Sequence, residues 1–280
     1  MKLALVVSVE ETEFGAVALR GSWEEGIRMA GALGYDGVEL AVRDPSAVDV
    51  GRLQTGLADA GLEVAAVGTG QAYLRDGLSL SSPDAGIRAR AIERVGSHLE
   101  LAVRLRAPVI IGLLRGRIED GAEETDRRFM RSLRQVLPVA ERSEGRILIE
   151  AINRYETNYL VTVDEALALI DRVGSDRLAV LADTFHMNIE EASPLDALRR
   201  CGKRLGHIHV ADSNRRAPGW GHLDFSDIIA VLKEIGYGGY LSAEIFPEPD
   251  PESAARQTIS HLRAIVDRSF DSRFTNHDSR

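Results

Sequence analysis

The chain has 280 residues, of which 44% are hydrophobic and 28% charged, a composition typical of a globular protein and unlike that of a disordered or membrane-spanning chain. Its formal net charge of -9 disfavours nucleic-acid partners, because nonspecific binding to a phosphate backbone depends on clustered Lys and Arg. A single domain is compatible with this length, since α/β barrels run to about 250 residues.

The start of the chain and its cysteine content indicate a location. The apolar run Leu3–Val7 is too short for a membrane span and lacks the small-residue cleavage pattern of a signal peptide, so it is typical of a first strand. Cys201 is the only cysteine and can form no internal disulfide, which fits a reducing compartment. We therefore expect a cytoplasmic enzyme with a small-molecule substrate and no membrane partner.

Two kinds of segment alternate along the chain. Apolar runs rich in β-forming residues predict eight strands, at Leu3–Val9, Gly37–Val42, Glu63–Val67, Val109–Leu114, Ile147–Glu150, Leu178–Asp183, Leu205–Val210 and Tyr240–Phe246. Helical periodicity predicts eight helices, at Trp23–Leu33, Val48–Ala60, Ala85–Leu105, Glu123–Arg142, Val163–Val173, Pro194–Cys201, Phe225–Ile235 and Glu252–Val266. Strict alternation predicts parallel strands with right-handed crossovers, and eight such units close most naturally into a (β/α)8 TIM barrel.

The predicted barrel occupies residues 1–268 as a single catalytic domain of α/β class, and the polar segment 269–280 is predicted to be a C-terminal tail. Gly34-Tyr35-Asp36-Gly37 separates a helix from the next strand, as C-terminal glycine stops do. The first strand is followed by Ser8-Val9-Glu10-Glu11 instead of a glycine-rich phosphate turn, which disfavours an open nucleotide-binding sheet.

Four late strands end in residues that bind metals. Catalytic groups of a barrel come from the C-terminal ends of its strands, where this chain places Glu150, Asp183, His209 and Glu244. Three carboxylates that face one another would repel unless a cation neutralised them, and oxygen ligands with one imidazole suit Mn²⁺, Co²⁺, Fe²⁺ or Mg²⁺. The sequence therefore predicts one divalent metal per chain, with His207 as a deeper, hydrogen-bonded core histidine.

The segments around these residues carry a resemblance. Glu150-Ala-Ile-Asn-Arg-Tyr-Glu156, Asp183-Thr-Phe-His186-Met-Asn and His209-Val-Ala-Asp-Ser-Asn-Arg215 resemble the D-tagatose 3-epimerase-like branch of the xylose isomerase-like barrels. The resemblance implies that the four predicted ligands bind one catalytic metal, usually manganese or cobalt, and that Glu156, His186 and Arg215 contact the substrate. It also implies a homo-dimer or homo-tetramer.

The N-terminal half narrows the resemblance. Ala41-Val-Arg43-Asp-Pro, Gly68-Thr-Gly-Gln71-Ala-Tyr73-Leu and Ile111-Gly-Leu-Leu-Arg115-Gly-Arg117 resemble the bacterial 5-keto-L-gluconate epimerases, which interconvert 5-keto-L-gluconate and D-tagaturonate. A sugar acid carries a carboxylate away from the metal, which needs a cationic partner, and Arg43 and Arg115 fall at strand ends on the catalytic side. Tyr73 would supply an apolar or stacking wall for the sugar.

Glu150 and Glu244 are the predicted acid–base pair. Epimerisation beside a ketone removes a proton and returns one to the opposite face, so it needs two groups on two sides of a planar intermediate. These glutamates end the fifth and eighth strands, the outermost of the four ligand strands, and should flank the metal. The metal would hold the ketone oxygen and the adjacent hydroxyl and stabilise the enediolate as a Lewis acid.

Other functions remain open at this point. A neutral D-tagatose or D-psicose 3-epimerase is the main alternative, followed by hydroxypyruvate isomerase and inosose dehydratase, which share the single metal and the enolisation step. A sugar-binding sensor needs many of the same groups. A three-zinc endonuclease is disfavoured by missing histidines, and a two-metal xylose isomerase by Ile152 where that enzyme uses lysine.

Overall fold

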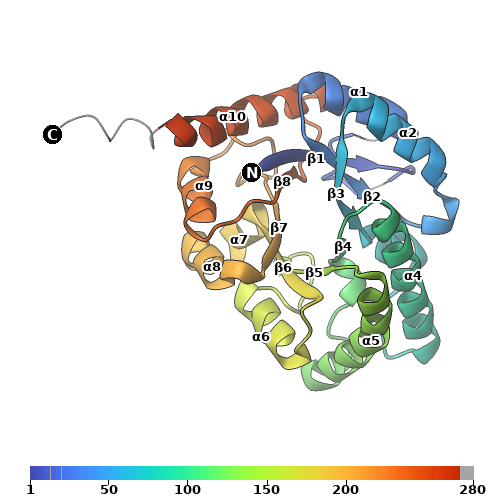
Figure 1. Cartoon of the computed structure of the whole chain (residues 1–280). Coiled ribbons are helices and arrows are strands. Elements are labelled where there is room, and N and C mark those ends of the chain that lie inside the picture. The colour runs from blue at the N-terminus through green and yellow to red at the C-terminus, as the bar shows by residue number, and fades with distance from the viewer. Residues whose placement is uncertain (13, 20, 272–280) are drawn as a thin grey trace.

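A computed structural model of the chain describes residues 1–12, 14–19 and 21–271. Eight parallel strands form a closed barrel in which each strand pairs with its neighbour in sequence and β8 pairs with β1 (Figure 1). The strands are β1 (Lys2–Ser8), β2 (Gly37–Ala41), β3 (Glu63–Gly68), β4 (Val109–Ile111), β5 (Ile147–Glu150), β6 (Leu178–Asp183), β7 (Leu205–His209) and β8 (Tyr240–Ala243). The predicted TIM barrel is confirmed.

An outer ring of helices surrounds the barrel (Figure 1). Its members are α1 (Trp23–Leu33), α2 (Val50–Ala60), α4 (Ala85–Arg104), α5 (Ala122–Ser143), α6 (Val163–Val173), α8 (Pro194–Cys201), α9 (Phe225–Glu234) and α10 (Pro251–Asp271). Helix α10 runs past the predicted domain boundary at residue 268, and the rest of the predicted tail lies outside the described residues. None of the described helices has the length and apolarity needed to cross a membrane.

Local sequence signals set the ends of several helices. The Thr162 side chain and Glu165 form a reciprocal capping box at the start of α6. Asp49 accepts a hydrogen bond from the backbone N–H of Arg52, which makes α2 begin later than the predicted Val48. Gly34 ends α1 in the left-handed conformation with φ of 85°, as the predicted glycine stop requires.

Among the elements that were not predicted are two short helices and a turn that follow strands on the catalytic side. They are α3 (Gly70–Asp76), α7 (Thr184–Glu190) and the 3-10 turn Leu113–Arg115. Both helices are seven residues long, which is too short for a hydrophobic period to stand out in the sequence.

The alternation of side chains along the strands explains how ligands reach the barrel mouth. A small apolar cluster of Ala66, Ile110, Leu148, Ala179 and Leu181 is separate from the large core that includes the residues packed under the helices. Successive strand side chains point to opposite faces. Glu150 therefore continues the row of Leu148, and Asp183 continues the row of Ala179 and Leu181, so both carboxylates point into the barrel.

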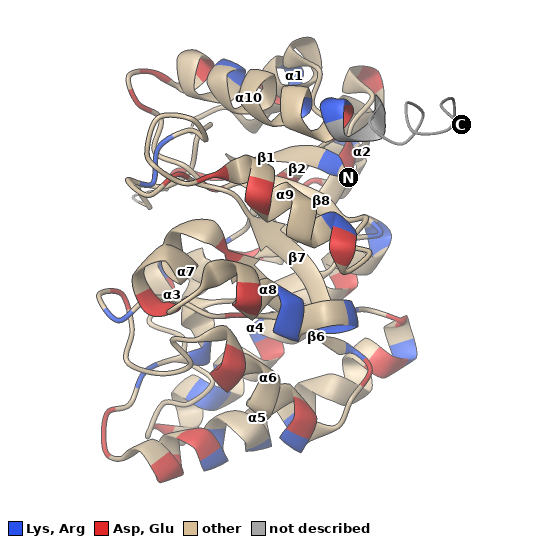
Figure 2. Cartoon of the chain, turned by 90° about the vertical axis from the view of Figure 1, so that its left-hand side faces the viewer, with Lys and Arg blue, Asp and Glu red and all other residues tan. Residues whose placement is uncertain are grey.

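Acidic and basic residues are interspersed along the outer helices in the view of Figure 2. Exposed pairs such as Arg199 with Glu234 and Arg200 with Asp164 link neighbouring helices. Exposed pairs of this kind contribute little to stability, about 0 to 1 kcal/mol each.

Candidate metal and active site

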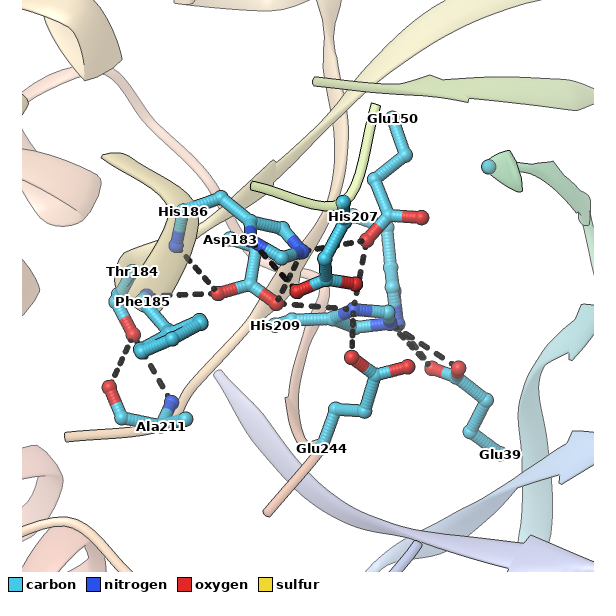
Figure 3. A network of polar contacts seen from close by, with 12 residues as sticks. Glu39, Glu150, Asp183, Thr184, Phe185, His186, His207, His209, Ala211 and Glu244 are labelled. Carbon is cyan, nitrogen blue, oxygen red and sulfur yellow. Dashed lines mark hydrogen bonds and ion pairs between the residues drawn. The ribbon is translucent and has the colours of Figure 1, made fainter. Parts of the chain in front are cut away.

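The four predicted ligands meet at the mouth of the barrel. Glu150, Asp183 and His209 are the last residues of β5, β6 and β7, and Glu244 directly follows β8. One ligand atom from each of the four lies within 4.8 Å of the others (Figure 3). Asp183 is fully buried, and Glu150 and His209 are almost so. The sequence grouping of these residues therefore corresponds to a compact cluster.

Two atoms of the cluster lack a hydrogen-bond partner although they are buried. They are Oδ2 of Asp183 and Nδ1 of His209. Nδ1 lies 3.5 Å from Oε1 of Glu150, 3.5 Å from Oδ2 of Asp183 and 3.9 Å from Oε2 of Glu244. Buried polar atoms without partners are rare, and a divalent cation among these atoms would satisfy them together. The donor set fits such an ion.

The charges of the cluster are strongly coupled. Burial raises the pKa of the Glu244 carboxyl to about 8, and the positive charges of His209 and Arg215 only partly offset this. Burial also opposes protonation of His209, but the carboxylates of Glu39 and Glu244 raise its pKa well above the ordinary value. A bound cation would replace this proton and favour the charged carboxylates.

Asp183 has a second role that frees one of its oxygens for the ion. Its Oδ1 accepts hydrogen bonds from the backbone N–H groups of Phe185 at 2.7 Å and His186 at 3.3 Å, which caps helix α7. Thr184 Oγ1 donates to the carbonyl of Ala211 at 2.6 Å and accepts from its N–H at 2.9 Å (Figure 3). The ends of β6 and β7 are thereby held together.

Glu39 is a functional residue that the sequence reasoning missed. Both of its carboxylate oxygens lie 3.1 Å from Nε2 of His209, and Oε2 lies 2.9 Å from Nε2 of His207 (Figure 3). Burial works against the charge of Glu39, but the two histidines hold its pKa below the ordinary value. The carboxylate keeps the proton of His209 on Nε2 and leaves Nδ1 to face the metal site.

Glu39, His207 and His209 also form a second group that could hold a metal. Glu39 already lies at hydrogen-bond distance from both histidines, and no atom of this group except Nδ1 of His209 is a buried atom without a partner. By this criterion the group of four fits an ion better than the second group does. The expected role of His207 as a hydrogen-bonded core histidine agrees with its contact to Glu39.

Replacing Glu39 by Gln is expected to lower the affinity for Mn²⁺ by about 10- to 100-fold, because an amide orients and polarises His209 less well. Titration calorimetry on metal-stripped protein measures this. The matched control is His207→Gln, which leaves the pair of Glu39 and His209 in place and should change affinity less than about threefold. Equal losses in the two variants would contradict this role of Glu39.

Glu156, His186 and Arg215 lie beside the ligands. The guanidinium of Arg215 donates to Oε1 of Glu156 at 2.6 Å and to Oε2 of Glu244 at 2.8 Å. It lies 5.3 Å and 4.9 Å from the ring centroids of Phe14 and Phe185. All three predicted substrate residues line one cavity together with Glu150, His209 and Glu244.

Two further residues hold this group in place, and neither was singled out from the sequence. Asn153 Nδ2 lies 2.7 Å from Nδ1 of His186 and donates to Oε1 of Glu156 at 3.1 Å. Asp212 is fully buried and accepts from three backbone N–H groups of the loop that carries Arg215. These donors are Ser213 at 2.8 Å, Gly219 at 2.8 Å and Leu223 at 3.1 Å.

Arg43, Arg115 and Tyr73, three further residues predicted to contact the substrate, are not among the residues that line this cavity. Arg43 donates to Oδ1 of Asp76 at 2.6 Å and 2.9 Å. Arg115 is fully buried, and its guanidinium donates to three backbone carbonyls. Tyr73 packs against the hydrophobic core. The two arginines therefore have partners already, and contact of these three residues with the substrate stays a prediction.

Gly112 gives Glu150 the room it occupies. A Cβ atom at Gly112 would lie 2.3 Å from Oε2 of Glu150. Gly112→Ala is therefore expected to displace the Glu150 carboxylate and to weaken Mn²⁺ binding by roughly tenfold or more. Mutations of residues that orient metal ligands have effects of this size. Calorimetry checks this against Gly96→Ala, whose added Cβ meets no atom within 4 Å and should leave affinity unchanged. Unchanged affinity in both variants would contradict the expectation.

Comparisons with known proteins show the family to which the chain belongs. Residues 27–265 match the family model described as xylose isomerase-like TIM barrel. An L-ribulose 3-epimerase of Mesorhizobium japonicum is 34% identical over 217 residues, which cover 76% of this chain and 72% of that protein. An L-ribulose 3-epimerase of Methylomonas sp. is 31% identical over 274 residues, covering 92% of this chain and 93% of that protein.

A solved structure has the same fold. A structure of L-ribulose 3-epimerase superposes with a TM-score of 0.83 at 26% sequence identity, and 99% of each chain is covered. The chain therefore belongs to the family of xylose isomerase-like TIM barrels, and within it is a sugar epimerase, an isomerase related to the ketose 3-epimerases.

Proposed function

We propose that the protein inverts the carbon next to the ketone of a free keto-sugar, with Glu150 and Glu244 as the two groups that move protons. The observation that carries this proposal is their placement. Figure 3 shows the two carboxylates on opposite sides of His209, and both lie in the wall of one cavity. Inversion needs an acid–base group on each face of the reacting carbon, and this pair supplies them.

The surrounding side chains support the two glutamates. Arg215 holds Glu244 by a charge-assisted hydrogen bond of 2.8 Å, so the carboxylate has a fixed direction. His186 Nε2 lies 3.9 Å from Oε1 of Glu150 and can contact the reacting end of a substrate. When bound, a divalent metal, Mn²⁺ in our proposal and Co²⁺, Mg²⁺ or Fe²⁺ as alternatives, supplies Lewis-acid stabilisation of the negative charge that develops on the ketone oxygen.

Two classes of substrate fit this chemistry. The resemblance of the N-terminal half supports a keto-sugar acid, with interconversion of 5-keto-L-gluconate and D-tagaturonate. The cavity favours a neutral ketose as a second candidate, because Arg215 is the only Lys or Arg among its described lining residues. The terminal nitrogens of Arg215 already donate hydrogen bonds to Glu156 and Glu244. The two relatives named above are L-ribulose 3-epimerases, and L-ribulose is a neutral sugar.

The test is an NMR assay of the Mn²⁺-loaded protein in deuterated water. We expect deuterium to enter at the carbon beside the ketone as the second epimer accumulates, with 5-keto-L-gluconate, D-tagatose, D-psicose and L-ribulose as the panel. A sugar-binding sensor would bind without exchange. Absence of exchange with every sugar of the panel would contradict the proposal. Cytoplasmic location and a homo-dimer or homo-tetramer stay predictions from the sequence.

A further inference from the structure

Gln71 presents an unused hydrogen-bond acceptor within the substrate cavity. It belongs to α3, directly after β3, and lines the same cavity as Glu150, His209 and Glu244. The side chain is only 4% exposed. Its Nε2 donates to Ser8 Oγ at 2.8 Å and to the carbonyl of Ala41 at 3.3 Å. Its Oε1 is buried and has no partner.

The neighbours of Gln71 fix which end of its amide is free. Ser8 Oγ donates its only proton to the carbonyl of Glu10 at 2.5 Å, so it can only accept from Gln71. The carbonyl of Ala41 can only accept as well. Both contacts therefore require the nitrogen, and the oxygen is left over. The nearby hydroxyl of Thr69 is no donor for it, because this hydroxyl donates to the carbonyl of Ile110 at 2.7 Å.

The place of Gln71 in the barrel points to the part of the substrate that it meets. In the closed order of eight strands, β3 stands opposite β7, which carries His209. Gln71 therefore comes from the strand across the mouth from His209, and its amide contacts the ends of β1 and β2. Buried acceptors that lack a proton donor are costly, and a ligand hydroxyl can supply the donor.

We propose that Oε1 of Gln71 accepts a hydrogen bond from a hydroxyl in the part of the sugar remote from the metal ligands, and that Gln71 is a specificity residue. This inference rests on the proposed function of the same cavity. A carboxylate has no proton to donate, so it does not fit at this point, and the carboxylate of a sugar acid would have to lie elsewhere in the cavity. A hydroxyl is the matching group.

The experiment combines substrate and protein changes in a double-mutant cycle. The best substrate of the wild-type enzyme is compared with analogues in which each remote hydroxyl is replaced in turn by hydrogen. For the wild type, loss of one particular hydroxyl is expected to lower kcat/KM and binding affinity by roughly 10- to 100-fold. In Gln71→Met, which keeps the side-chain length but has no amide, the same analogue should lose less than about threefold relative to the intact sugar.

The matched control is Gln54→Met, the same substitution on α2, where Gln54 Nε2 donates to a backbone carbonyl. Gln54→Met should lose as much kcat/KM and affinity with the analogue as the wild type does. The inference is overturned if the wild type tolerates loss of every remote hydroxyl, or if Gln71→Met keeps the same penalty. Even if Gln71→Met folds poorly, the wild type measured with all the analogues shows whether any remote hydroxyl matters. An affinity that depends on the hydroxyl in the wild type but not in Gln71→Met, without epimerisation, would support the role of Gln71 and contradict the proposed function.

Discussion

Glu150→Gln and Glu244→Gln are each expected to lower net epimerisation by about 10²- to 10⁴-fold, the range that a positioned acid–base group contributes. The two variants should differ in a way that net rates do not reveal. Each leaves one carboxylate in the cavity, so each should still exchange the proton of the one epimer that presents its C–H bond to that carboxylate. Glu150→Gln and Glu244→Gln should therefore retain deuterium exchange with opposite epimers.

The measurement is NMR of deuterium incorporation, started separately from each epimer. Both glutamates are also assigned as metal ligands, so metal content has to be determined in the same samples, and the assay uses Mn²⁺ concentrations that restore full loading. Glu165→Gln, at an exposed cap of α6, is the control for the substitution itself and should keep the wild-type rate. Loss of exchange from both epimers in a fully loaded variant would contradict the two-base mechanism.

The barrel itself could be predicted from the sequence because its signals are local and periodic. Each strand is a short apolar run and each outer helix has a 3.6-residue period, and these repeat in strict alternation. The short helices α3 and α7 could not be found in this way. Each depends on a tight turn after a strand, and α7 begins because Asp183 caps it while also facing the metal site.

The grouping of the four candidate metal ligands could also be predicted, because the strand ends of a barrel meet at one mouth whatever the loops do. Glu39 was missed although a charged residue inside the apolar run of β2 is a visible signal. Its partners lie on β7, which is distant in sequence, and only the closed barrel brings them together. For Arg115, the position near a strand end does not reveal that backbone carbonyls accept hydrogen bonds from its guanidinium.

Asp183→Asn is expected to abolish the stabilisation that Mn²⁺ gives the protein while the fold persists. The Asn carbonyl oxygen can still accept from the N–H groups that cap α7. The amide nitrogen takes the place of Oδ2, and this nitrogen has no lone pair to offer a cation. At a Mn²⁺ concentration of 100 times Kd, the wild type should gain about 2.7 kcal/mol of unfolding free energy. Thermal unfolding with and without Mn²⁺ measures the difference.

Asp224→Asn is the matched control, because Asp224 caps α9 through two backbone N–H groups in the same way but lies outside the cluster. Asp224→Asn should keep the full gain in unfolding free energy that Mn²⁺ gives the wild type. If Asp183→Asn also keeps it, the group of four ligands is the wrong site. The second group shares only His209 with the first, so a shift that survives in Asp183→Asn but disappears in His207→Gln would place the ion between Glu39 and the two histidines.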